Sequence, residues 1–202
     1  MRMNHLHRLF NVCVAASLLF LGGNEADACA CCSDPGDHAI TTANIEGFHT
    51  AELENLEFAA AAKLHLTDAD DGPPKGVKVE SESFEVTAAF EAKGWRLTFR
   101  ATDGQTGVIT LRVPPKLTIF AADIHDGQTS GGGGPLLYKE WRFEGTASAT
   151  GFFAKAPARY TLILQGRGNR CDGSADFTHW RLAIEGKQAD FAFFGELASA
   201  GR

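Results

Sequence analysis

The chain has 202 residues, a net charge of −6 and 44% hydrophobic residues, and it contains five cysteines. This length suits one domain with a proper hydrophobic core. An acidic chain with scattered arginines argues against nucleic acid, and against an anionic membrane surface, as its partner.

Residues 1–28 have the pattern of a cleavable secretory signal peptide. Arg2 and Arg8 precede an apolar run over residues 9–21, and Ala26-Asp27-Ala28 forms an A-x-A cleavage site. The run is shorter than the roughly 20 apolar residues that span a bilayer, and no later stretch is apolar enough. We therefore expect a periplasmic or secreted protein without a transmembrane segment after the signal.

Cleavage after Ala28 would place Cys29 at the new N-terminus, as in bacterial lipoproteins. A lipoprotein signal has an aliphatic residue three positions before the cysteine and small neutral residues after it. Asp27 fits that pattern poorly. Lipidation of Cys29 is therefore the less favoured alternative.

Residues 29–49 are polar and rich in cysteine, so we expect an extended segment lying over a single β-rich domain of residues 50–202. The exported chain would keep Cys29, Cys31, Cys32 and Cys171. Bridges between near neighbours in the cluster are strained, because a disulfide needs Cα atoms about 4.4–6.8 Å apart with correctly directed Cβ atoms. The sequence thus predicts a structural disulfide between Cys171 and one of the other three.

Two thiols of the cluster would then remain near a chain end. Thiolates are soft ligands, so Cys29, Cys31 and Cys32, helped by His38 or His49, could bind copper, or else zinc. The competing interpretation is that all four cysteines form two structural disulfides, as oxidising compartments favour. A redox role ranks third, because the cluster lacks the Cys-x-x-Cys spacing.

The rest of the chain predicts one short N-terminal helix followed by strands. Residues 50–64 are predicted to be helical, since the alanine run 59–62 favours a helix, although residues 63–67 could already belong to a strand. After residue 76 the apolar residues alternate with polar ones, the side-chain period of a half-buried strand. Strands are expected over residues 84–90, 95–100, 108–113, 138–146, 160–165, 177–186 and 191–194, and residues 117–121 form a short apolar run. This pattern predicts a mainly β fold, an antiparallel β-sandwich or barrel of about seven to eight strands.

A tryptophan followed by an arginine stands at the head of three alternating segments, at Trp95, Trp141 and Trp180. The favoured interpretation is that each tryptophan fills the core, while each arginine pairs with a cross-strand acid such as Glu144 or Glu185.

Two loops carry polar side chains that could serve a site. Asp123, His125 and Asp126 could bind a metal or act as acid and base, although a solvated turn is favoured. Residues 167–173 lack the lysine and hydroxyl of a phosphate-binding loop, so we expect a hairpin connection pinned by Cys171.

Two hypotheses for function follow. The first is a non-catalytic exported protein that binds a soft metal such as copper through its cysteine cluster. The alternative is a lipocalin- or sandwich-like binding module for an organic ligand or a protein partner, with purely structural disulfides. An enzyme ranks third, because no nucleophile or acid–base constellation stands out.

Overall fold

The computed structural model describes residues 31–65, 74–125, 134–171 and 173–198. The chain divides into two units, and only the second, Cys31–Arg202, contains described residues. The predicted signal peptide, Cys29, Asp126 and the run of four glycines lie outside the described part, apart from the last of those glycines, Gly134.

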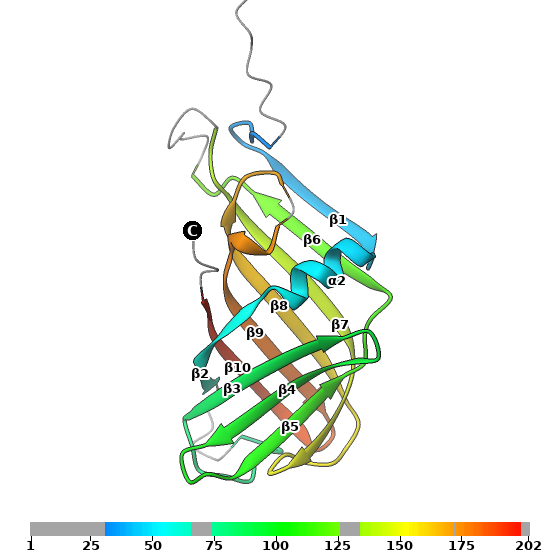
Figure 1. The fold of residues 1–202 in the computed structure, drawn as a ribbon, viewed down its shortest axis with the longest axis vertical. Helices are drawn as coiled ribbons and strands as arrows, with labels where there is room; N and C mark the ends of the chain where they lie inside the picture. The colour runs from blue at the N-terminus through cyan, green and yellow to red at the C-terminus, as the bar shows by residue number, and fades with distance from the viewer. Residues whose placement is uncertain (1–30, 66–73, 126–133, 172, 199–202) are drawn as a thin grey trace, which may run out of the picture. The chain divides into compact units, whose positions relative to one another are not determined.

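The described unit is mostly antiparallel β-structure with one short α-helix and a closed eight-stranded barrel (Figure 1). Its elements in chain order are β1 (His38–Asn44), α2 (Gly47–Glu54), β2 (Glu57–His65), β3 (Ser83–Glu91), β4 (Gly94–Ala101), β5 (Thr106–Leu111), β6 (Lys116–Ala122), β7 (Leu137–Gly151), β8 (Ala158–Gly168), the 3₁₀ turn η1 (Ser174–Asp176), β9 (Phe177–Gly186) and β10 (Ala189–Ala198). The predicted mainly β fold is confirmed, and of its two alternatives the barrel is observed.

Strand β7 explains how the sheet both closes and extends. One edge of this 15-residue strand pairs with β8 over residues 137–147. The other edge pairs first with β6, over residues 138–143, and then with β5, over residues 147–151. Pairing of the second half of β7 with β5 therefore closes the barrel. Its first half pairs with β6, which pairs with β1, so these two strands form an extension of the sheet beyond the barrel.

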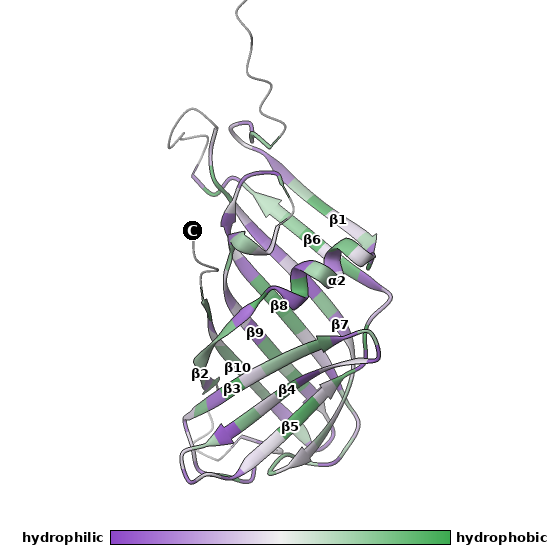
Figure 2. Ribbon diagram, in the orientation of Figure 1, coloured by the Kyte–Doolittle hydropathy of each residue, from purple (hydrophilic) through white to green (hydrophobic). Residues whose placement is uncertain are grey.

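Alternating burial along the barrel strands shows which side chains point into the core. In β4 the side chains of Trp95, Leu97 and Phe99 are buried, while Arg96 and Arg100 are exposed. Figure 2 shows the same alternation of hydrophobic and hydrophilic residues along the barrel strands. Trp95, Trp141 and Trp180 are all no more than 2% exposed, which confirms the core role predicted for them.

The predicted helix over residues 50–64 is wrong in its position and length. The helix begins at Gly47, because the Nδ1 atom of His49 accepts a hydrogen bond from the backbone N–H of Glu46 at 3.1 Å. It ends at Glu54, and residues 57–65 form β2 instead, paired with β10 and β3. Two interactions outweigh the modest helix preference of the alanine run. One is the packing of Phe58 on Trp180, whose ring centroids are 5.1 Å apart, and the other is the pairing of β2 with its neighbouring strands.

The helix covers one end of the barrel. Leu53 of α2 is fully buried, and the ring of His49 lies 5.4 Å from that of Trp141. The side chain of Glu52 accepts a hydrogen bond from the backbone N–H of Ser174 in η1. Because α2 also contacts β3, it ties three parts of this end together.

Candidate functional site

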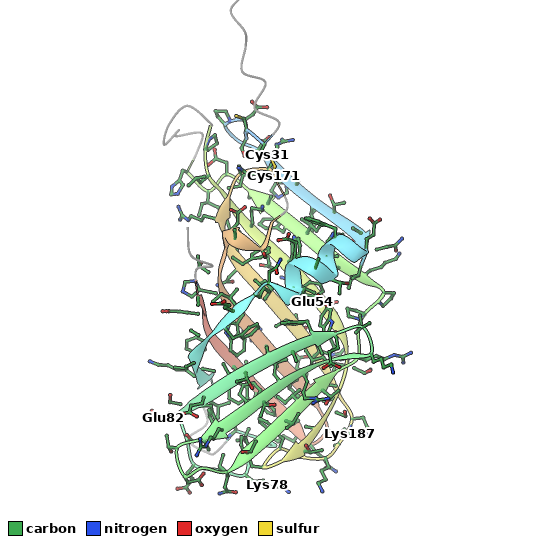
Figure 3. The ribbon with its side chains drawn as sticks, viewed as in Figure 1. Cys31, Glu54, Lys78, Glu82, Cys171 and Lys187 are labelled. Atoms are coloured by element: carbon green, nitrogen blue, oxygen red, sulfur yellow. A yellow bond between two sulfur atoms is a disulfide. The ribbon has the colours of Figure 1, made fainter. Side chains whose placement is uncertain are left out.

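A disulfide joins the segment before β1 to the connection after β8. Cys31 and Cys171 are 140 residues apart in sequence, and their Cα atoms are 5.0 Å apart. Figure 3 shows both residues at the same end of the described unit, beside the start of β1. The predicted long-range bridge from the cluster to Cys171 is thereby confirmed, with Cys31 as the partner.

An ion pair and a backbone hydrogen bond reinforce this connection. The guanidinium of Arg170 donates two hydrogen bonds to the carboxylate of Asp37, one of them of 2.8 Å from Nε to Oδ2. The backbone N–H of Arg170 donates to the carbonyl of Cys31 at 3.0 Å. Hydrogen bonds from Arg170 and from the backbone N–H of Asp34 lower the pKa of Asp37 below its ordinary value of 3.8. The N-terminal segment is therefore held to the barrel by covalent and polar contacts.

The cysteines available to a soft metal are limited in this oxidised state. Cys32 is also disulfide-bonded, so neither Cys31 nor Cys32 presents a thiolate. His38 packs its ring 5.5 Å from that of Phe120, whereas His49 is buried against Trp141. Within the described residues no group of three or more His, Cys, Asp and Glu side chains is arranged to hold a metal ion. Cys29 lies outside the described residues, so metal binding through Cys29, Cys31, Cys32 and His38 stays a prediction.

A buried lysine lies beside the disulfide, and sequence reasoning did not single it out. Lys139 of β7 is 2% exposed, and its Nζ lies 2.8 Å from Oδ2 of Asp176. The same ammonium donates a hydrogen bond to the carbonyl oxygen of Cys171. The period of two along β7 was the available signal, because it places Lys139 on the same inward face as Trp141.

Two glycines of β8 allow η1 to approach this ion pair. A Cβ atom added to Gly166 or Gly168 would overlap the backbone carbonyl or the carboxylate of Asp176. The missing side chains therefore let Asp176 lie flat against β8 and reach Lys139. This arrangement orders the connection that carries Cys171.

Between the extension of the sheet and the loop after β8 lies a groove of about 240 Å³, called here the open groove. Side chains from one face of β1, β6 and β7 form its floor, and polar residues lie at one end. Its lining comprises Asp37, His38, Ala39, Thr41, Ile119, Ala121, Leu137, Lys139, Asn169 and Arg170. Both cations in this lining are paired with acids, Arg170 with Asp37 and Lys139 with Asp176, so the charges within these two pairs cancel.

Strand β1 borders the open groove and is an edge strand among the described residues, where it pairs only with β6. The pairing is regular over all seven residues, without a bulge. Six of the seven residues are exposed, and Ile40 is 67% exposed. The strand contains no Lys, Arg, Asp, Glu or Pro, which are the residues that proteins place on edge strands to prevent further pairing.

The second predicted cluster, around Asp123, forms a structural turn. Its carboxylate accepts hydrogen bonds from the backbone N–H groups of Gly36, at 3.0 Å, and His125, at 2.9 Å. The Nε2 atom of His125 contacts the guanidinium of Arg167. These contacts fasten the segment before β1 to the end of β6, as the turn interpretation expects, whereas Asp126 lies outside the described residues.

Comparisons with family models, with curated proteins and with solved structures find no match to this chain. Among the described residues, no helix has both the length and the apolar character needed to cross a membrane.

Proposed function

We propose that this protein is an exported, non-catalytic binding module that takes an extended, uncharged segment of a protein partner at β1 and the open groove. The observation that carries this proposal is the regular, uncharged edge of β1 next to a groove with an apolar floor. An extended peptide can add as a further strand to such an edge. Its backbone then supplies affinity, and its alternate side chains supply specificity.

Export is supported by the signal pattern of residues 1–28 and by disulfide bonding at Cys31, Cys32 and Cys171. Disulfides form and persist mainly in oxidising compartments, so these cysteines fit a periplasmic or secreted protein. The disulfide between Cys31 and Cys171 holds the segment before β1 to the connection after β8.

A protein segment fits the geometry better than an organic ligand held inside the barrel. Lipocalin-like ligands occupy the barrel interior, but here Trp95, Tyr160 and Phe193 are among the large side chains buried there. A small pocket whose lining includes Ile109 and Phe191 measures only about 10 Å³. The open groove is the more accessible surface, and its paired charges favour a neutral partner over an ionic one.

The proposal is non-catalytic because the two cations beside the groove are already engaged with carboxylates, and His38 packs its ring against Phe120. Lys139 and Arg170 each donate to a carboxylate. A general base or nucleophile needs a free group directed toward a substrate.

The competing soft-metal hypothesis requires thiolates, so it predicts that thiol titration of protein isolated without reductant finds reactive cysteines that Cu(I) protects. A titration that finds no free thiol would exclude thiolate binding of copper.

The proposal is tested by titrating the isotopically labelled protein with a capped peptide of alternating valine and threonine. We expect amide chemical-shift changes confined to β1, β6 and the first residues of β7. In the variant Ala39→Trp a large side chain enters the open groove, and we expect the affinity to fall by about tenfold or more. The matched control is Ala89→Trp, at an exposed position of β3, which should bind as the unmodified protein does. Changes elsewhere on the barrel, or equal loss in both variants, would contradict the proposal.

A further inference from the structure

We infer that the segment added at β1 is β1 of a second copy of this chain, so that the protein self-associates through a two-fold strand pair. This inference rests on the proposed function and names its partner. The argument begins with the exposure of β1: six of its seven residues are exposed in the single chain. A regular, uncharged edge of seven residues is a template for pairing with another strand.

The sequence of β1 is compatible with its own antiparallel copy. An antiparallel pair centred on Thr41 places Ala39 opposite Ala43 of the second copy, and Ile40 opposite Thr42. His38 comes opposite Asn44, and Thr41 opposite itself. No formal charge meets a like charge in this register, and threonine pairs and small side chains are well tolerated across strands.

Self-pairing also covers a large, exposed apolar side chain of the strand. Ile40 is 67% exposed and shares its face with Phe120, which lies directly opposite it on β6. In the pair centred on Thr41, the two Ile40 side chains become diagonal neighbours on one face. Each would gain apolar contact that the single chain does not provide, which favours association.

The strand is held firmly enough to act as a preformed edge. Cys31–Cys171 and the pair of Asp37 with Arg170 fix the chain just before it. After it, the backbone N–H of Ile45 donates to the carbonyl of Pro115 at 3.2 Å. A fixed edge loses little conformational freedom on pairing, so less of the interaction free energy is spent on ordering.

The expected association is weak, because seven residues per copy form an interface below the roughly 1,200 Å² of a standard complex. Sedimentation analysis of the disulfide-bonded protein, from low micromolar to near-millimolar concentration, should show a monomer–dimer equilibrium. Thr41→Lys and Thr41→Glu each place like charges opposite one another at the two-fold axis. Each variant alone should lose affinity by about tenfold or more.

The two variants together provide the decisive measurement, since a mixture of Thr41→Lys and Thr41→Glu should restore the dimer as a mixed species. The control Thr87→Lys, at an exposed site in the middle of β3, should associate like the unmodified protein. A monomer at all concentrations, or variants that dimerise unchanged, would overturn the inference. If the protein stays monomeric but the alternating peptide still binds at β1, the proposed function stands and only self-pairing is excluded.

Discussion

The ammonium group of Lys139 lies 2.8 Å from a carboxylate oxygen of Asp176, with the lysine side chain only 3% exposed and the aspartate side chain 27% exposed. The pair connects β7 to η1, next to the Cys31–Cys171 bridge. Because a buried charge is costly unless paired, this contact holds the loop after β8 in one position.

Lys139→Met should lower the free energy of unfolding by about 2–4 kcal/mol, because the Asp176 carboxylate, with its side chain only 27% exposed, loses its cation. Urea unfolding at neutral pH measures this loss. The control is Arg159→Met, which removes the exposed pair of Arg159 with Glu185, whose side chains are 81% and 57% exposed. It should cost less than about 1 kcal/mol. Equal losses would show that burial of the Lys139 pair has no energetic consequence.

Gly168→Ala should break the same ion pair by displacing its acid, Asp176, instead of removing its lysine. Its new Cβ would overlap the carboxylate of Asp176, so the carboxylate has to move away from Lys139. We expect a stability loss similar to that of Lys139→Met, and a double variant that loses much less than the sum of the two. Gly173→Ala is the matched control, because its Cβ meets only the end of Glu52, at 3.9 Å. Fully additive losses would contradict the coupling.

There is a physical reason why the sequence predicted some elements of the fold and not others. Alternation predicted most strands well, since period-two burial acts locally: Trp95, Leu97 and Phe99 all point inward as expected. It did not predict β1, because both faces of that strand are exposed and no alternation exists to detect. The alanine run of β2 was misassigned because its conformation depends on pairing with distant β10. Cysteine spacing predicted the bridge to Cys171, but which cysteine it reaches depends on tertiary geometry, as does the partner of Lys139.

The contact between Arg170 and Asp37 should make stability depend on pH. Hydrogen bonds from Arg170 and from the backbone of Asp34 lower the pKa of Asp37 in the folded state. A lowered carboxyl pKa stabilises the fold above the unfolded value, and this contribution is lost as the pH falls through the folded value. Arg170→Gln should therefore be less stable than the unmodified protein at pH above about 5, and the difference should shrink as the pH drops below 3.8. Unfolding curves at several pH values measure this, and a difference that grows in acid would contradict the assignment.

The pKa values of the two tyrosines of the chain report independently on burial and hydrogen bonding in the barrel wall next to the extension. Partial burial, and then the hydrogen bond from its hydroxyl to Glu140 at 3.0 Å, raise the pKa of Tyr138 to about 12. Burial also raises the pKa of Tyr160, whose hydroxyl donates to the carbonyl of Arg112 at 2.9 Å. Both shifts favour the protonated phenol in the folded state. Their stabilising contribution is therefore complete below the ordinary pKa of 10.0 and is lost as the pH rises through the folded values.

Ultraviolet titration of tyrosinate should consequently show no ionisation near pH 10 while the protein stays folded. In Glu140→Gln the first tyrosine to ionise should do so at lower pH, yet above the ordinary value, because burial is the larger cause of the shift and remains. Glu144→Gln, on the same strand and face, is the control and should leave the titration unchanged. If Glu140→Gln does not move the first ionisation, the link between Tyr138 and Glu140 is absent in solution.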